Sequence, residues 1–191
     1  MERLEPERAN RPPNQTPAFQ GPSGRQSVRA GSGLSVSPTR DESKVAAMIT
    51  VRAGKPADLT GLIALDAVAR REPRRVDFIR RSIEQATCFV AEQHSATIGY
   101  GVLTHSFYGN AMIEMVYVGK RFRRSVVGSA LVRFAESLAK TPKVFTSTNL
   151  SNKPMQLLLG RHGYVLTGYI DNLDEGDPEL VYFRRLGDKQ G

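Results

Sequence analysis

The sequence is poor in the residues that build disulfides and metal centres. It has one cysteine, no tryptophan and three histidines in 191 residues. The lone thiol, Cys88, excludes an intramolecular disulfide framework and any site that needs several thiolates. The histidines, at positions 94, 105 and 162, show no metal-ligand spacing. We therefore expect no metal and a reducing, cytoplasmic location.

Long apolar runs are also absent. No run approaches the roughly 20 residues that a helix needs to cross a bilayer. The N-terminal residues lack the apolar core of a secretory signal, and three early glutamates argue against an organellar transit peptide. We expect a soluble, untargeted protein without a membrane partner.

Charge and composition fit one globular domain with a tail. Hydrophobic residues make up 40% of the chain and charged residues 24%, with a formal net charge of +8. This charge favours anionic partners, among them nucleic acid and polyphosphate cofactors. Residues 1–47 are rich in Pro, Gly, Ser and Arg, so we predict a disordered tail before a domain at 48–191. Alternatively, Met48 is the true start, because a strand-like segment begins there.

Alternating periodicities predict an α/β domain. From residue 48 onward, strand-like and helix-like runs follow the order β-α-α-β-β-β-α-β-α-β-β. This order predicts a central mixed, mostly antiparallel sheet of about seven strands with helices on both faces. The expected helices begin near Pro56, Arg74, Ser125 and Lys153, and the expected strands are 48–53, 86–93, 96–105, 112–118, 143–149, 164–170 and 179–186.

The segment KRFRRSVVGSALVRF, residues 120–134, reads as a loop that enters a helix. Apolar residues recur at helical spacing from Val126 to Leu138, so one stripe of the helix should pack on the sheet. Its first turn would then present unpaired N–H groups and the positive end of the helix dipole at a strand end. Arg123 and Arg124 add charge that a pyrophosphate would use. The alternative is a solvated basic turn.

This loop resembles the cofactor loop of the GNAT acyltransferase family, Q/R-x-x-G-x-G/A. Arg123 and Gly128 fill the first and last places, but Val126 stands where the first glycine is usual. Lys120 likewise replaces a proline in the approach to the loop. Further on, TSTNLSNKPMQLLLGRHGYVLTG resembles the family's N-x-x-A and G-F segment, with Asn152 opening a helix. The resemblance covers residues 49–186.

The resemblance implies acetyl-CoA as a co-substrate. Its pyrophosphate would lie on the loop and the first helical turn, and its pantetheine arm would pair like an extra strand with the backbone of 116–118. Asn152 matches a position that often helps to hold this arm. The implied cofactor-binding residues are Val116, Tyr117, Val118, Arg123, Arg124, Ser125, Val126, Val127, Gly128, Ser129 and Asn152.

Valine at position 126 is compatible with phosphate binding. Main-chain N–H groups hold the phosphates, and valine has one just as glycine does. We expect Val126 to adopt an ordinary helical conformation and to point its side chain into the core.

Glu114 is the candidate general base. It is the one acid in the apolar strand MIEMVYV, and strand alternation places it on the face of Val116 and Val118, opposite Met115 and Tyr117. An alkyl amine titrates at roughly pH 10.4, so a nearby carboxylate would help to deprotonate it. Members of the family with polyamine-like substrates have a glutamate base at this place. The alternatives are a charge at a wet edge and a structural salt bridge.

The usual general acid of the family is missing. Where many members have a tyrosine, seven residues after the asparagine, this chain has Leu159. By family analogy the Val116 N–H would meet the oxyanion. Cys88 reads as a small buried hydrophobe and not as an acyl carrier. Other candidate acids, each of which also reads as an ordinary strand residue, are Tyr117, Tyr164, Ser147 and Thr148.

Two charged segments complete the pattern. Residues 70–75 (RREPRR), with Arg80 and Arg81, read as a solvated helix connection. The family resemblance makes this basic cluster a candidate border of the acceptor groove, suited to an acidic or phosphorylated acceptor. Few aromatics interleave it, which argues against nucleic acid as a partner. Residues 171–179 (DNLDEGDPE) read as a turn stabilised by Asp and Asn, with attraction of a polyamine as the alternative.

Two functions remain open. The first is an acetyl-CoA-dependent N-acetyltransferase that acetylates a primary amine of a small molecule or peptide directly, in a ternary complex. The second is a catalytically degenerate GNAT-like module that binds CoA or acts as a basic interaction domain, with Val126 and Leu159 as marks of decay. Glu114 and the basic loop favour the first. Exposed sheet edges also make a homodimer an expectation.

Overall fold

The computed structural model describes residues 49–187, which lie in one compact unit. The order of elements that the sequence predicts is confirmed. The predictions for residues 1–47 and for a start at Met48 lie outside the described residues. The strands are β1 (Ile49–Ala53), β2 (Cys88–Gln93), β3 (Ala96–Phe107), β4 (Asn110–Val118), β5 (Lys143–Asn149), β6 (Val165–Ile170) and β7 (Glu179–Arg185). The helices are α2 (Leu59–Leu65), α3 (Pro73–Glu84), α4 (Val127–Leu138) and α5 (Lys153–Arg161), with 3-10 turns η1 (Pro56–Asp58) and η2 (Lys120–Phe122).

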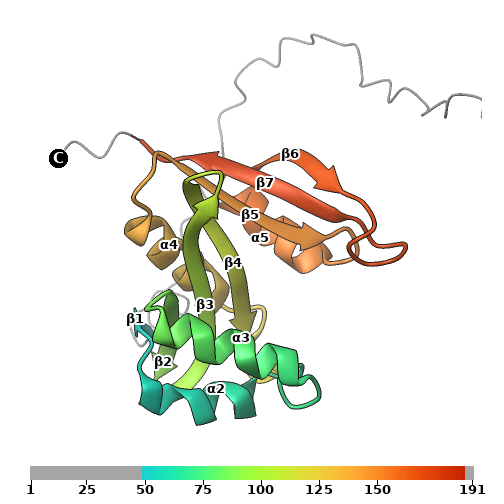
Figure 1. Ribbon diagram of the computed structural model, residues 1–191. Coiled ribbons are helices and arrows are strands. Elements are labelled where there is room, and N and C mark those ends of the chain that lie inside the picture. Colours follow the sequence, from blue (N-terminus) through green and yellow to red (C-terminus); the bar gives the residue numbers. More distant parts are fainter. Residues whose placement is uncertain (1–48, 188–191) are drawn as a thin grey trace, which may run out of the picture. The chain divides into compact units, whose positions relative to one another are not determined.

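The strands form one twisted sheet in the order β1-β2-β3-β4-β5-β7-β6 (Figure 1). Within residues 49–187, β4 and β5 are the one parallel pair, and the other neighbours are antiparallel. The mixed, mostly antiparallel sheet is therefore confirmed. Between β2 and β3, His94 and Ser95 have φ angles of 49° and 63°, as a tight type I′ turn requires.

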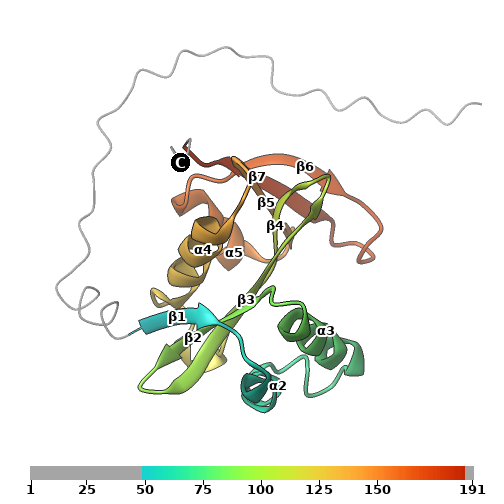
Figure 2. The ribbon, with the colours of Figure 1, turned by 60° about the vertical axis from the view of Figure 1, so that its left-hand side comes forward.

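Helices cover both faces of the sheet, as predicted. On one face, Leu62 of α2 and Ile79 of α3 pack in a cluster with Tyr100 of β3. On the other face, Leu131 of α4 and Leu159 of α5 belong to the larger core cluster. Figure 2 shows the two helix pairs on opposite sides of β3 and β4.

Two helix starts differ from the prediction. The helix expected from Pro56 begins with the turn η1 and continues as α2. The helix expected from Ser125 begins at Val127, with Val126 at the N-cap, and Ser125 lies in the turn before the helix. Its Oγ donates to Phe122 O (2.5 Å) and accepts from Val127 N–H (3.4 Å).

Arg52 joins three elements at one edge of the sheet. It donates to both carboxylate oxygens of Asp58, each at 2.8 Å, and to Glu92 through Nε at 3.1 Å and through Nη2. The hydrogen bond from Arg52 lowers the pKa of the Asp58 carboxyl below its ordinary value. Asp58 also accepts from Lys55 N–H (2.7 Å), so the cluster fixes the turn that leads β1 into α2.

Asp58→Asn should reduce the change in unfolding free energy that occurs as the pH falls from 7 into the acid range. A carboxyl with a lowered folded pKa contributes stability above its ordinary pKa, and this contribution is lost as the pH falls through the folded value. The wild type should therefore be more stable than Asp58→Asn at pH 7, and the difference should shrink below about pH 4. Urea unfolding at a series of pH values measures this.

The control is Asp77→Asn, which removes an exposed ion pair with Arg80 and should have little effect at any pH. A stability difference between wild type and Asp58→Asn that stays constant from pH 7 to pH 3 would contradict the assignment.

Candidate active site

The sheet opens between β4 and β5. These strands pair over a short stretch, from Ala111 with Val144 to Ile113 with Thr146. The Thr146 hydroxyl donates to Ile113 O (3.0 Å) at the end of this stretch. Beyond it, β4 runs on to Val118 with no neighbouring strand on that side among residues 49–187, and Figure 1 shows the two strands diverging. Apart from Val118 O, which accepts from Arg123 Nε, the outward backbone groups of this half of β4 are therefore open to a ligand.

Glu114 forms a bulge in β4. The register with β3 moves from Leu103 opposite Ile113 to Val102 opposite Met115, which leaves Glu114 without a partner residue. The extra residue shifts the alternation of the strand by one. Ile113 thus belongs to the core under α4, whereas Met115 packs with the cluster under α3.

The bulge corrects the predicted orientation of Glu114. The carboxylate accepts from Thr104 Oγ1 (2.6 Å) and lies on the α3 face with Met115. Val116 and Val118, with which it was expected to share a face, pack against the core on the α4 side. The prediction was wrong because it assumed a regular strand, and residue 114 is inserted into the ladder.

The open edge of β4 presents two peptide units. Gly119 N–H donates to Ile98 O (2.9 Å), which sets the phase of the ladder with β3. Alternate residues of an antiparallel strand bond to the same neighbour, so Tyr117 bonds to β3, and Val116 and Val118 direct their N–H and C=O groups to the opening. Of the three peptide units expected there, that of Tyr117 faces the other way.

The Tyr117 side chain lies on the α3 face. Its ring stacks on that of Tyr100, with centroids 5.7 Å apart, and its hydroxyl accepts from Ala67 N–H (2.9 Å). Tyr100 donates to the fully buried Asp66 (2.7 Å). The pKa of Tyr100 is raised, mainly by burial and secondly by this hydrogen bond. The Tyr117 hydroxyl is therefore held by the link between α2 and α3.

The loop before α4 carries two exposed arginines. Arg123 Nε donates to Val118 O (3.1 Å), and Arg124 has a left-handed backbone with φ of 59°. Val126 has φ −73° and ψ −5°, which is the ordinary helical conformation expected. Its side chain is only half-buried, and the next residue, Val127, occupies the core position instead.

The first turn of α4 adjoins the opening. Ala130 N–H donates to Val126 O (2.9 Å) and is the first N–H of the helix to do so, whereas the N–H groups of Gly128 and Ser129 come before it and have no acceptor within the helix. A Cβ on Gly128 would lie 3.1 Å from Leu158 of α5 and 4.0 Å from the side chain of Val118. The helix end, the open strand edge and the two arginines thus lie together as one candidate site.

Two replacements of Arg124, by glycine and by alanine, should separate the cost of its left-handed backbone from the effect of losing the side chain. A non-glycine residue in the left-handed region costs roughly 1 kcal/mol, which glycine avoids. Arg124→Gly should therefore be more stable than Arg124→Ala by about this amount, as measured by urea unfolding. Equal stabilities of the two variants would show that residue 124 is not held in the left-handed region.

Glu114 lines a groove of about 190 Å³ between α3 and the β3–β4 hairpin. Thr104 and Ser106, whose Oγ lies 3.4 Å from Glu114 Oε1, hold the carboxylate. In the part of the chain that the structure describes, no Lys or Arg nitrogen lies within 4.0 Å of this carboxylate. Glu114 is therefore free of the structural salt bridge considered from the sequence. The lining residues are Phe78, Arg81, Ser82, Gln85, Thr87, Val102, Thr104 and Glu114.

Three other positions considered from the sequence, Asn152, Leu159 and Tyr164, make contacts that stabilise the fold. Asn152 caps α5, where its Oδ1 accepts from Met155 N–H (3.3 Å) and its Nδ2 donates to Thr148 Oγ1 (2.9 Å). Leu159, at the usual place of the acid, is fully buried, and Tyr164 lies in the same core.

Cys88 does not have the surroundings of a nucleophile. Its side chain is buried, and this burial, with a smaller contribution from Asp58, raises the pKa of the thiol to about 12. The thiol therefore stays protonated near neutral pH, which argues against an acyl-cysteine intermediate.

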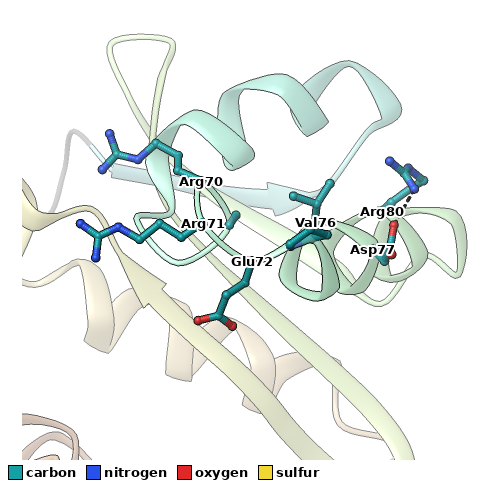
Figure 3. Close-up of a pocket in the computed structure, with 8 residues that line it drawn as sticks. Arg70, Arg71, Glu72, Val76, Asp77 and Arg80 are labelled. Carbon is teal, nitrogen blue, oxygen red and sulfur yellow. Dashed lines mark hydrogen bonds and ion pairs between the residues drawn. The ribbon is translucent and has the colours of Figure 1, made fainter.

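A second groove, of about 320 Å³, lies at the connection between α2 and α3. Figure 3 shows Arg70 and Arg71 extending away from α3, whereas Arg80 pairs with Asp77 at 2.8 Å. Glu72 also lines this groove. The basic cluster in the sequence is thus partly neutralised by acids of its own segment.

The acidic loop after β6 braces the end of β5. Asp174 accepts from Asn149 Nδ2 (2.7 Å), and Asp177 accepts from the N–H (2.9 Å) and Oγ (2.7 Å) of Ser151. These contacts support the interpretation of 171–179 as a structural turn.

Three further expectations concern metal, membrane and self-association. Among residues 49–187, no cluster of three or more His, Cys, Asp or Glu side chains could hold a metal ion. No helix in that range has the length and apolar character needed to cross a membrane. The edge strand β6 exposes Leu166, Tyr169 and Ile170, but a homodimer stays a prediction.

Comparison with known proteins places this geometry in a family. A family model described as the acetyltransferase (GNAT) family matches residues 59–164. A GNAT-family acetyltransferase from Bacillus cereus is 27% identical, with a TM-score of 0.69 over 73% of this chain and 98% of that chain. The resemblance to the GNAT family is confirmed.

Two more distant structures share the fold. Ard1 from Thermoplasma volcanium is 20% identical, with a TM-score of 0.63 over 73% of this chain and 98% of its own. Naa50 from Arabidopsis thaliana, in complex with the bisubstrate analogue CoA-Ac-MVNAL, is 15% identical, with a TM-score of 0.60 over 73% and 99%. A search of curated proteins finds no match.

Proposed function

Because the chain belongs to the acetyltransferase (GNAT) family, we propose that it transfers the acetyl group of acetyl-CoA directly to a primary amine in a ternary complex. The observation that carries this proposal is the opening of the sheet beside Glu114. The open edge of β4 follows directly after Glu114, which lines the groove, and Val118 at its end lies beside the first turn of α4. Donor and acceptor would therefore meet at one point of β4.

The donor would bind along the opening. The C=O of Val116 and the N–H of Val118 can pair with the amides of the pantetheine arm, as an added strand would. The pyrophosphate would lie on the N–H groups of Gly128 and Ser129, near Arg123 and Arg124. Naa50, which shares the fold, is in complex with an analogue that contains CoA. Asn152 would act indirectly, by fixing the start of α5 at the far side of the opening.

Glu114 would receive the proton of the amine, directly or through a water molecule. Its carboxylate is held by two hydroxyl groups and has no cation beside it among the described residues, so it can accept from an incoming ammonium. The N–H of Val116, two residues along the strand, would bind the oxyanion of the tetrahedral intermediate. The thiolate of CoA is a tolerable leaving group, since a thiol titrates at roughly pH 8.5.

Calorimetric titration with acetyl-CoA tests the donor site. ATP is the matched control, because it carries polyphosphate and adenosine but no pantetheine arm. We expect saturable binding of acetyl-CoA that is at least tenfold tighter than that of ATP, because only acetyl-CoA pairs with β4. Equal binding of the two would mean that the basic loop acts as a simple polyanion site.

Glu114→Gln should lower kcat for acetyl transfer by roughly 10²–10⁴-fold, because the amide cannot accept the proton. The remaining rate should rise with pH as more of the free amine is neutral. Initial rates of CoA release at several pH values measure both effects.

The control for Glu114→Gln is Glu84→Gln, which removes an exposed carboxylate near the end of α3 and should leave kcat unchanged. A Glu114→Gln enzyme with the wild-type rate and pH profile would exclude Glu114 as the base.

A further inference from the structure

We propose that the acceptor carries a carboxylate as well as the reacting amine, and that Arg81 of α3 binds this carboxylate. The inference rests on the proposed function, because it takes Glu114 as the place of the amine. It narrows the acceptor from primary amines in general to small amino acids.

The Glu114 groove contains one charge of each sign. Of its eight lining residues, Glu114 is the single acid and Arg81 the single base. Phe78 and Val102 supply apolar wall between polar groups. A ligand with an ammonium group and a carboxylate would therefore find a partner for each charge within one groove.

Arg81 has capacity to bind an anion. Its Nε lies 3.4 Å from Asp77 O of its own helix, and among residues 49–187 no carboxylate lies within 4.0 Å of its guanidinium. The neighbouring Arg80 differs, because it pairs with Asp77 at 2.8 Å and lines the other groove. A guanidinium can give a carboxylate two parallel hydrogen bonds.

The hydroxyl donors in the groove are already in use. Ser82 Oγ donates to Phe78 O (2.7 Å), and Thr87 Oγ1 donates to Ser82 O (3.1 Å). Thr104 donates to Glu114 (2.6 Å). Beside the neutral amide of Gln85, Arg81 is therefore the one charged donor that this groove offers to an anionic group of the ligand.

The groove is small. About 190 Å³ is below the range of roughly 300–1,000 Å³ that is usual for pockets of drug-sized ligands. A single amino acid fits this space better than a folded protein surface. The amide carbonyl that follows a peptide N-terminus would bring no negative charge to Arg81.

The test compares free amino acids with their carboxamides, which have nearly the same shape but no negative charge. Wild-type enzyme and acetyl-CoA are combined with each pair, and with spermidine as an amine that lacks a carboxylate. We expect the best amino acid to exceed its carboxamide at least tenfold in kcat/KM. Arg81→Gln should remove this preference, mainly through a higher KM for the acid, and Arg81→Lys should restore part of it.

Arg80→Gln is the control variant, and it should keep the wild-type preference. Equal kcat/KM values for acids and carboxamides, or preference for spermidine, would overturn the inference while leaving the proposed function intact. An unchanged preference in Arg81→Gln would overturn the role of Arg81. Binding of acetyl-CoA without transfer to any amine would overturn the proposed function, and this inference with it.

Discussion

The early end of the pairing between β4 and β5 is the constraint on which the site depends. Parallel neighbours normally satisfy each other's backbone groups along their whole length. Here the ladder stops at Ile113 and Thr146, where a threonine hydroxyl takes over the bond to the strand. The peptide units that follow on β4 lack a neighbouring strand on that side within the described residues. A ligand that offers amide groups can occupy the place of the missing strand.

The helices on the two faces give this opening its two sides. On one face, the apolar stripe of α4 fixes the helix so that its first turn lies beside Val118. On the other face, α3 packs on Tyr100 and Val102 and forms one wall of the Glu114 groove. The buried Asp66 supports this side, since it accepts from Tyr100 and from the N–H of Val68 (2.8 Å). Both proposed binding regions thus lie on helices and strands that pack in the two cores.

Much of the fold and part of the site could be predicted from the sequence. Hydrophobic periodicity gave the order of elements, and the helical stripe gave the position of α4 and the backbone of Val126. The bulge at Glu114 could not be predicted, because the run MIEMVYV reads as a regular strand until its pairing with β3 is known. The position of Arg81 in the Glu114 groove could not be predicted for a similar reason. Its separation from Arg80 into a different groove depends on the rotation of α3 against the sheet.

The bulge also makes Glu114 different from its neighbours in β4: Ile113 and Met115 have partner residues in β3, and Glu114 has none. With position 114 left out, the alternation of β4 would run unbroken from Ile113 to Met115, with each side chain on its present face. The proposed base is therefore an insertion into an otherwise regular strand. Its side chain is exposed and neither core packs around it, so the packing of the sheet places no demand on the chemistry of this residue.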